Sequence, residues 1–178
     1  LFNKMNEPHS RSSEIDKKRG VFKFDAELDR QFADLPTLGP YKYENGATYL
    51  GQYKNGKRHG KGIQIWTDGS SYKGYWLNDL YDLKGRLTHS DGDYYEGEFK
   101  KGVCSGVGTY EHVDGTVFTG EWSDNKQNGK GKESWVDGST FTGEYKNSLK
   151  HGKGRFLWKD GSSYEGDFHQ NEIHGFGT

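Results

Sequence analysis

The architecture of this chain can be read in residues 137–145, Asp-Gly-Ser-Thr-Phe-Thr-Gly-Glu-Tyr. A turn dipeptide, Asp-Gly, precedes two aromatic residues that stand on either side of a glycine. This arrangement recurs six times at a period of 23 residues without a single insertion, with Asn-Gly as the dipeptide in the first copy. The turn glycines are Gly46, Gly69, Gly92, Gly115, Gly138 and Gly161. So strict a period predicts one supersecondary unit built six times side by side.

Three further columns of residues keep the same frame. Three residues after each turn glycine stands an aromatic residue, namely Tyr49, Tyr72, Tyr95, Phe118, Phe141 and Tyr164. A glycine follows two positions later, at Gly51, Gly74, Gly97, Gly120, Gly143 and Gly166. The second aromatic column is Tyr53, Trp76, Phe99, Trp122, Tyr145 and Phe168, and each copy closes with Gly-x-Gly, as at Gly129 and Gly131. The glycines of this chain are therefore mostly part of the repeat pattern, at fixed positions in each copy.

Each copy predicts a β-hairpin. Tyr49, Gly51 and Tyr53 alternate with other residues at the period of a strand that has two different faces. The polar segment 54–59 is predicted to be a hairpin loop. Residues 67–69, Thr-Asp-Gly, are predicted to form a three-residue loop with glycine in the left-handed region, because a two-residue turn would move the aromatic residues to the opposite face. This register places Gly62 opposite Gly51 on one side and Gly74 on the other.

A glycine stripe then crosses the sheet between the aromatic columns, whose rings can lie over backbone that has no Cβ. We expect this aromatic face to bind a partner, either a peptide, a helix or a second copy of the chain. Its residues are Tyr49, Tyr53, Trp66, Tyr72, Trp76, Tyr95, Phe99, Phe118, Trp122, Trp135, Phe141, Tyr145, Trp158, Tyr164 and Phe168. The other face carries the opposite charges Glu121 and Lys130, and Glu144 and Lys153, facing each other across strands. We expect that face to be mostly solvated, since exposed ion pairs contribute little.

The segment before the repeats differs in composition. Residues 1–19 are polar and charged, which predicts an extended or partner-bound arm. Asp25 can cap a short helix from Ala26 to Leu35 that ends at Pro36, with Leu28 and Phe32 on its apolar face. Two roles remain open for this helix, a cap over the open edge of the sheet and a docking element for another chain.

Two regions follow from this division. Residues 1–38 form the N-terminal arm with its capping or docking helix, and residues 39–178 form the repeat array, whose sixth repeat is truncated. Because the first residue is not methionine and the last repeat stops early, we expect the chain to be a segment of a longer protein.

The composition limits the kinds of core and compartment. Only 30% of the 178 residues are hydrophobic and 15% are aromatic, so aromatic rings must supply most of the burial. The single cysteine, Cys104, excludes an intramolecular disulfide and fits a reducing compartment. No apolar run is long enough to cross a bilayer, and no signal-peptide pattern stands at the start.

Several apparent sites are better explained by the repeat. Residues 102–106, Gly-Val-Cys-Ser-Gly, resemble a nucleophile elbow, but both glycines belong to repeat columns. His59, His151 and His174 share a column, yet positions one repeat apart lie two strands apart, about 10 Å, which is too far for two ligands of one zinc. The basic column that includes Lys61, Lys130 and Lys153 alternates with acidic residues, which disfavours nucleic acid. We therefore predict no catalytic residue, metal site or cofactor.

The pattern Asp-Gly-x-x-Tyr-x-Gly-x-Trp, followed by Gly-x-Gly at a 23-residue period, resembles the MORN repeat (membrane occupation and recognition nexus). The resemblance covers residues 39–178, and Asp137, Gly138, Phe141, Gly143 and Tyr145 match it in one unit. Departures are Leu83 in place of a closing glycine, and His89 and His112 where other copies have Trp. The resemblance implies an all-β fold: an elongated, twisted, single-layer antiparallel sheet of six stacked hairpins. It implies no catalytic chemistry.

Two classes of function agree with this resemblance. The first is a structural scaffold within a large assembly, since similar arrays occur in radial spokes and other axonemal complexes, and these repeats resemble those of protist ciliary proteins. This class implies protein partners and a cytoplasmic, cytoskeletal location, in the axoneme of a cilium or flagellum. The second class is a membrane-associated or regulatory module, as in lipid kinases that carry MORN repeats. The net charge of −1 makes strong attraction to anionic lipid the less favoured expectation.

Overall fold

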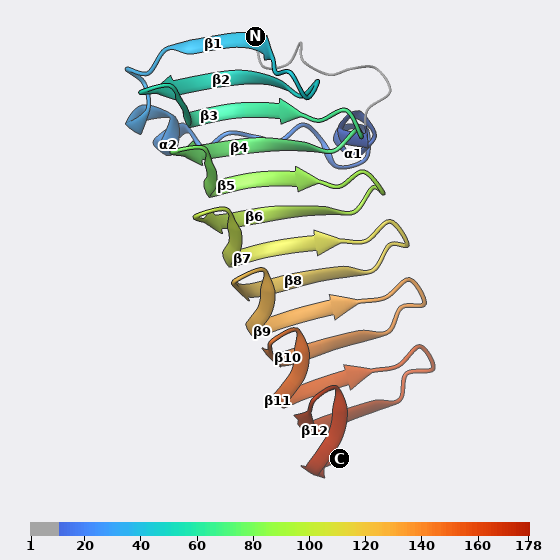
Figure 1. Ribbon diagram of the computed structural model, residues 1–178. Coiled ribbons are helices and arrows are strands. Elements are labelled where there is room, and N and C mark those ends of the chain that lie inside the picture. The colour runs from blue at the N-terminus through green and yellow to red at the C-terminus, as the bar shows by residue number, and fades with distance from the viewer. Residues whose placement is uncertain (1–10) are drawn as a thin grey trace. The chain divides into compact units, whose positions relative to one another are not determined.

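The structure, a computed structural model, describes residues 11–178, which divide into two compact units that meet in sequence between Gly102 and Val103. The first unit contains α1 (Arg11–Arg19), α2 (Ala26–Gln31), β1 (Thr37–Lys42), β2 (Thr48–Lys54), β3 (Lys57–Ile65), β4 (Ser71–Leu77), β5 (Leu80–Thr88) and β6 (Tyr94–Lys100) (Figure 1). The second contains β7 (Val103–Glu111), β8 (Val117–Ser123), β9 (Lys126–Ser134), β10 (Thr140–Lys146), β11 (Leu149–Leu157), β12 (Ser163–His169) and β13 (Glu172–Gly177). Within each unit every strand pairs antiparallel with its neighbours in sequence. The predicted all-β fold, an open antiparallel sheet of hairpins, is confirmed.

The Asp-Gly dipeptides form the predicted three-residue loops. The Trp66 amide donates to the Ser70 carbonyl at 3.0 Å, and the Gly69 amide donates to the Trp66 carbonyl at 3.1 Å. Gly69 has a φ of +85°, a region that L side chains rarely adopt. The Asp68 carboxylate accepts the Ser70 amide at 2.9 Å, which satisfies a loop donor. The loop thus needs both residues of the dipeptide, one for its side chain and the other for its backbone.

The alternate connections are shorter than predicted. Lys54 pairs with Lys57, so the connection is a two-residue turn rather than the polar loop expected over residues 54–59. Its central residues, Asn55 and Gly56, have φ values of +52° and +74°. Two positive values in a row match the type I′ turn, whose twist fits paired strands and whose preferred sequence is Asn-Gly. The prediction was wrong because Asn55 and Gly56 complete the turn by themselves. The polar residues 57–59 therefore belong to β3.

The glycine stripe has the predicted register. Gly62 faces Gly51 on β2 and Gly74 on β4. The ring of Tyr49 lies over the stripe, since a Cβ built on Gly62 would lie 2.6 Å from Tyr49 Cζ. The Tyr49 hydroxyl donates to the Gln52 carbonyl at 3.0 Å, which fixes the ring in place. Only glycine leaves room for a ring at this distance from the backbone.

A bulge follows the stripe in these hairpins. The register shifts between Gly51 and Tyr53, and the Gln52 side chain accepts the Lys61 amide at 2.8 Å across the bulge. In the second unit Glu121 accepts the Lys130 amide in the same way. Bulges twist the strand and re-aim the residues that follow. The expected side-chain charge pair of Glu121 with Lys130 is therefore wrong, because the carboxylate binds the backbone instead.

The aromatic columns form the core of each unit. Tyr49 and Trp76 are 0% and 1% exposed, and their rings meet edge to face at 5.6 Å. In the second unit Phe141 is fully buried and packs edge to face on Phe168 at 5.0 Å. In both pairs the rings meet across the strand that lies between them, and such contacts supply the burial that scarce aliphatic residues cannot.

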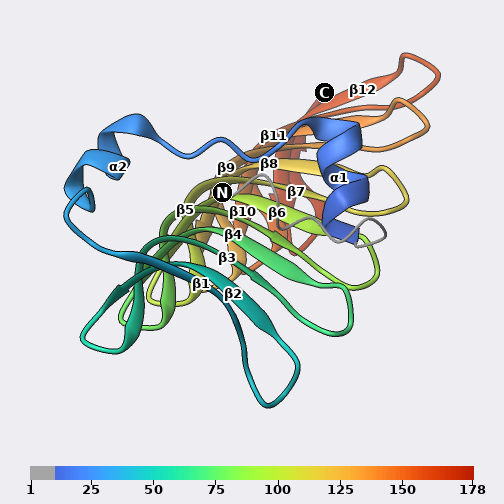
Figure 2. The ribbon, with the colours of Figure 1, turned by 90° about the horizontal axis from the view of Figure 1, so that it is seen from above.

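The opposite face differs between the units. In the first unit the N-terminal segment covers it, and Figure 2 shows α1 and α2 on the same side of the strands. Leu50, Ile63 and Tyr75, which belong to this face, are at most 5% exposed. The expectation of a mostly solvated face is therefore wrong for the first unit, and the helix covers a face of the sheet rather than its edge. In the second unit the same face is exposed, as at Thr119, Lys132 and Thr142.

Candidate functional site

The N-terminal segment begins with a helix that sequence reasoning missed. Residues 11–19 form α1, where an extended or partner-bound arm was expected over residues 1–19; residues 1–10 of that prediction lie outside the described part of the chain. Asp16 is buried and binds two cations of the sheet, Lys73 on β4 and Arg86 on β5. Arg86 also donates to the Gly20 carbonyl at 2.8 Å, just beyond the end of the helix. The helix forms because tertiary partners neutralise its charge, which its own sequence does not reveal.

The second helix has the predicted cap but ends earlier. The Asp25 side chain accepts the amides of Glu27 and Leu28 at 2.9 and 3.3 Å, the arrangement of an N-cap. The helix ends at Gln31, and Phe32 to Leu35 form a turn whose carbonyls accept the Gln52 amide, at 2.7 Å from Phe32 and 3.3 Å from Leu35. The predicted helical end at Leu35 was wrong because these carbonyls bind the sheet instead of continuing the helix.

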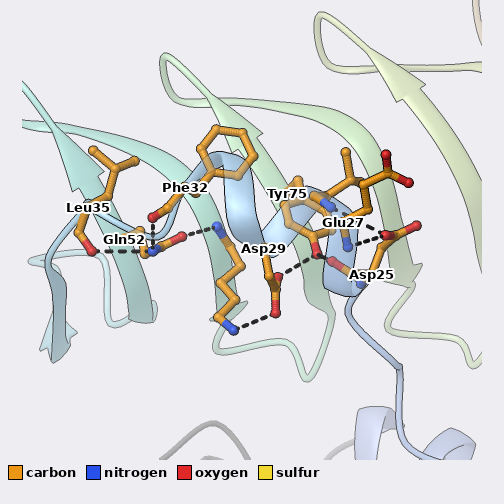
Figure 3. Close-up of polar contacts among 9 residues, drawn as sticks. Asp25, Glu27, Asp29, Phe32, Leu35, Gln52 and Tyr75 are labelled. Carbon is orange, nitrogen blue, oxygen red and sulfur yellow. Dashed lines mark hydrogen bonds and ion pairs between the residues drawn. The ribbon is translucent and has the colours of Figure 1, made fainter.

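Tyr75 is the centre of the contact between α2 and the sheet (Figure 3). Its hydroxyl donates to the Asp29 carboxylate at 2.7 Å and accepts the Asp25 amide at 2.9 Å. Burial is the main cause that raises the pKa of this hydroxyl well above its usual value, so it remains a donor. Lys61 binds Asp29 at 2.8 Å, and Lys84 binds Asp25 at 2.7 Å. The face of β2–β5 thus holds a helical segment through one tyrosine and four cations.

The predicted aromatic face is only partly accessible. Of its two main columns, all rings except Tyr53 and Tyr164 are buried against one another. The most accessible ring of the predicted set is Trp158, which is 37% exposed. It lies beside Phe156 at 4.7 Å, and Phe156 stacks on Trp135 at 5.3 Å. A partner could bind the buried columns only if the core opened. The part of the aromatic face that a partner can reach is therefore the row formed by Trp135, Phe156 and Trp158.

Two other members of the aromatic face were missed. Phe156 belongs to it, and so does Tyr81, which stacks on Tyr72 at 4.0 Å. Both could have been found from strand parity, because Phe156 pairs with Phe141 and Tyr81 with Trp76. The cation Lys150 lies over the rings of this face, 5.1 Å from Trp135, and binds Glu133 at 3.4 Å.

The positions that resembled catalytic or metal sites have a structural explanation. Cys104 is buried, and burial raises the pKa of its thiol to about 12, so the reactive thiolate is scarce at neutral pH. His169 lies between His151 and His174, with ring centres 5.0 and 5.5 Å apart. Within residues 11–178, no group of three or more His, Cys, Asp or Glu residues is placed to hold a metal ion. None of the helices in this part of the chain is long and apolar enough to cross a membrane.

Comparison with known proteins agrees with the repeat analysis. The MORN repeat family matches six consecutive segments, residues 49–71, 72–94, 95–117, 118–140, 141–163 and 164–178. No curated protein matches the chain. A similar solved structure is the SAS-4 (dCPAP) TCP domain in complex with a proline-rich motif of Ana2 (dSTIL) of Drosophila melanogaster, with 15% identity over 75% of this chain and 73% of that chain and a TM-score of 0.43. With contiguous repeats over residues 49–178, each built as a hairpin around the same glycine stripe, the chain belongs to the MORN repeat family.

Proposed function

We propose that this chain is a non-catalytic scaffold that docks segments of other proteins onto its hairpin sheet, within a large cytoskeletal assembly. MORN repeats, which match residues 49–178, indicate an interaction module. A scaffold needs no reactive group, because it holds its partners by packing, ion pairs and hydrogen bonds.

One observation carries this proposal: the sheet already holds a helical segment of its own chain. The face of β2–β5 binds residues 16–35 through Tyr75, Gln52 and the cations that pair with Asp16, Asp25 and Asp29. These contacts join residues 17 to 70 positions apart in sequence, so most of them are long-range contacts like those between two proteins. A sheet face that accepts one short amphipathic segment has the chemistry to accept another.

The assembly we propose is an axonemal complex of a cilium or flagellum, such as a radial spoke. The support is the resemblance of the compact, uninterrupted repeats to those of ciliary MORN proteins, and the single buried cysteine fits the reducing environment of that compartment. Tagged full-length protein should localise to the cilium of ciliated cells and remain with the axoneme after detergent extraction. Diffuse cytoplasmic protein that detergent fully extracts would contradict the axonemal part of the proposal.

Cross-linking mass spectrometry of the tagged protein, purified with its assembly, tests the scaffold function itself. We expect a small set of partners whose cross-links converge on the lysines of one sheet face. A protein that is recovered alone and without reproducible cross-links to any partner would argue against a scaffold, wherever it localises.

A membrane-bound module is the second candidate. The observation in its favour is a group of exposed cations, Lys130, Lys132 and Arg155, that lie on one face of the second unit. Carboxylates of Glu121, Glu144 and Glu165 alternate with them, which weakens attraction to an anionic bilayer. We therefore expect little co-sedimentation of the chain with phosphatidylserine or phosphoinositide vesicles at physiological salt. Robust co-sedimentation would favour the membrane candidate over the scaffold.

A further inference from the structure

The N-terminal segment, residues 11–36, turns acidic side chains toward the sheet. As a sequence it is balanced, with six basic and six acidic residues. In the structure its aspartates pair with cations of β3–β5: Asp16 with Lys73 and Arg86, Asp25 with Lys84, and Asp29 with Lys61. These ion pairs join the segment to the sheet, so the charge that remains on the outer surface of the segment is mainly basic.

The remaining cations are concentrated in one stretch. Residues 17–24, Lys-Lys-Arg-Gly-Val-Phe-Lys-Phe, contain four basic residues and no acidic one. All four cations are exposed, three at the end of α1 and one in the connection to α2. We call Lys17, Lys18, Arg19, Val21 and Lys23 the basic ridge.

Two phenylalanines fix the connection on the sheet. Phe22 is buried and meets Phe24 edge to face at 5.2 Å, and Phe24 meets Tyr75 on β4 at 5.6 Å. Because these rings face the sheet, the alternate residues Val21 and Lys23 face solvent, and Val21 is 51% exposed. Figure 2 shows the connection on the same side of the first-unit strands as both helices. The ridge therefore continues from α1 into a segment that is held in place.

The cations of the ridge differ from those of another basic run. Residues 54–61 also contain four basic residues and no acidic one. In that run Arg58 binds Asp79 at 3.0 Å and Lys61 binds Asp29 at 2.8 Å. Within residues 11–178, by contrast, neither Lys17 nor Lys23 forms an ion pair. An anionic partner would thus meet less competition from carboxylates of this chain at the ridge than at residues 54–61.

The composition of the ridge favours an acidic polypeptide over a bilayer. Val21 is its one apolar side chain, since Phe22 and Phe24 pack on the sheet. Insertion into a membrane interface needs a larger apolar surface beside the cations. An acidic polypeptide needs only carboxylates that reach the cations, where charge-assisted hydrogen bonds form, and one apolar side chain over Val21.

We infer that the basic ridge docks an acidic segment of a partner protein, with carboxylates on Lys17 and Lys23 and an apolar side chain over Val21. This inference rests on the proposed scaffold function and names the surface and the chemistry of one partner. The ridge lies on the outer side of the N-terminal segment, so docking leaves the contacts of that segment with the sheet in place.

The test uses the full chain and a short fluorescent peptide of glutamates with one central leucine, measured by anisotropy at physiological salt. We expect the double variant K17E/K23E to weaken binding by about tenfold, since two attractive exposed pairs become repulsive. The variant K54E/K57E is the matched protein control: it changes the net charge equally in the other basic run and should weaken binding less than about twofold. A peptide with glutamine in place of every glutamate is the matched ligand control and should not bind.

A third variant tests the apolar contact. Val21→Ser should weaken binding of the leucine-containing peptide about twofold, because it removes part of the apolar surface that the leucine covers. Binding of an all-glutamate peptide should not change. A loss that is the same for both peptides would show that no apolar side chain lies over Val21, which would overturn that part of the inference.

The other outcomes separate the ridge from competing sites. Binding that K17E/K23E and K54E/K57E weaken equally would overturn the inference, as would equal binding of the glutamine peptide. If K17E/K23E reduces binding to phosphatidylserine vesicles but not to the peptide, the ridge is a lipid site and the inference is wrong.

The purified assembly distinguishes failure of the ridge from failure of the scaffold function. A carbodiimide couples amines directly to carboxylates that contact them. We expect it to join Lys17 or Lys23 to an acidic stretch of a partner. If partners cross-link elsewhere on the chain and never to these lysines, the scaffold function stands and this site fails.

Discussion

Gly143 on β10 and Gly154 on β11 face each other with no room for a side chain between them. A Cβ built on Gly143 would lie 2.6 Å from Gly154 Cα and 2.7 Å from the ring of Phe141. Both neighbours are fixed, one as backbone and the other as a fully buried ring. The glycine stripe is therefore a steric requirement of the aromatic core, whereas the turn glycines are a conformational requirement of the loops.

This difference predicts unequal costs for the same substitution. Gly143→Ala should lower the free energy of unfolding by about 2–3 kcal/mol, because the ring and the facing strand must both move. Gly138 has a φ of +92° but open space around it, so Gly138→Ala should cost only about 1 kcal/mol. Urea denaturation followed by tryptophan fluorescence compares the two variants directly. A loss for Gly138→Ala that equals or exceeds that for Gly143→Ala would show that loop conformation matters more than the stripe.

Leu83 stands where the other closing pairs have glycine, and it keeps their conformation. Its φ is +58°, as Gly60 and Gly129 have +84° and +112° at the equivalent positions. A leucine in this region costs about 1–2 kcal/mol relative to glycine. Leu83→Gly should therefore stabilise the chain by up to about 1 kcal/mol, after the loss of some side-chain burial. Gly106→Leu, the reverse change one repeat later, is the control and should destabilise; a stabilising Gly106→Leu would refute this account.

Asp16 should control whether α1 stays on the sheet. Asp16→Asn leaves Lys73 and Arg86 buried beside a neutral amide, which costs about 3 kcal/mol or more when one partner of a buried ion pair is removed. The chain can avoid this cost by releasing α1 and exposing both cations to water. Hydrogen exchange should then accelerate at residues 13–22 while β10–β12 stay protected. Lys17→Gln, an exposed change on the same helix, should leave exchange unaltered; unchanged protection of α1 in Asp16→Asn would show that the ion pairs do not hold the helix.

Acid should weaken the docking of α2 through Asp25. The hydrogen bond from Lys84, with the amides of Glu27 and Leu28, lowers the pKa of this carboxyl below its ordinary value of 3.8. A lowered pKa in the folded state stabilises the fold fully above the unfolded value, and this contribution is lost as the pH falls through the folded value. Asp25→Asn keeps an N-cap but removes the charge. The stability difference between wild type and Asp25→Asn should be constant from pH 6 to 8 and shrink below about pH 4. Denaturant titrations at several pH values measure it, and a difference that grows in acid would contradict the assignment.

The aromatic face shows both the reach and the limit of sequence reasoning. Strand parity correctly placed Tyr49, Gly51 and Tyr53 on one face and Gly62 opposite Gly51. It did not reveal that rings such as Phe141 are buried among their neighbours rather than open to a partner. Exposure depends on how far the rings of adjacent repeats close over one another, and that is a property of packing in three dimensions.

Comparison of equivalent positions in the repeats indicates that one face of the first unit is covered. Leu50, Ile63 and Tyr75 are apolar or aromatic at positions that become Thr119, Lys132 and Glu144 three periods later. A face that is apolar in the first repeats and charged in the later ones should be covered only in the first. What covers it could not be inferred, because α1 is too short and too polar to predict a stable helix by itself.

The sequence by itself determined the hairpin repeat, the three-residue loops and the register. These depend on residues close together in the chain: Asp68 and Gly69 fix a loop locally, and the alternation of side chains then sets the pairing along the glycine stripe. The tertiary structure alone decided that α1 forms and lies on β4 and β5, and that Asp16 meets Lys73 and Arg86, 57 and 70 residues away. Burying a charge is unfavourable until its distant partners are in position to pair with it. The residues next to Asp16 in the sequence therefore could not indicate this contact.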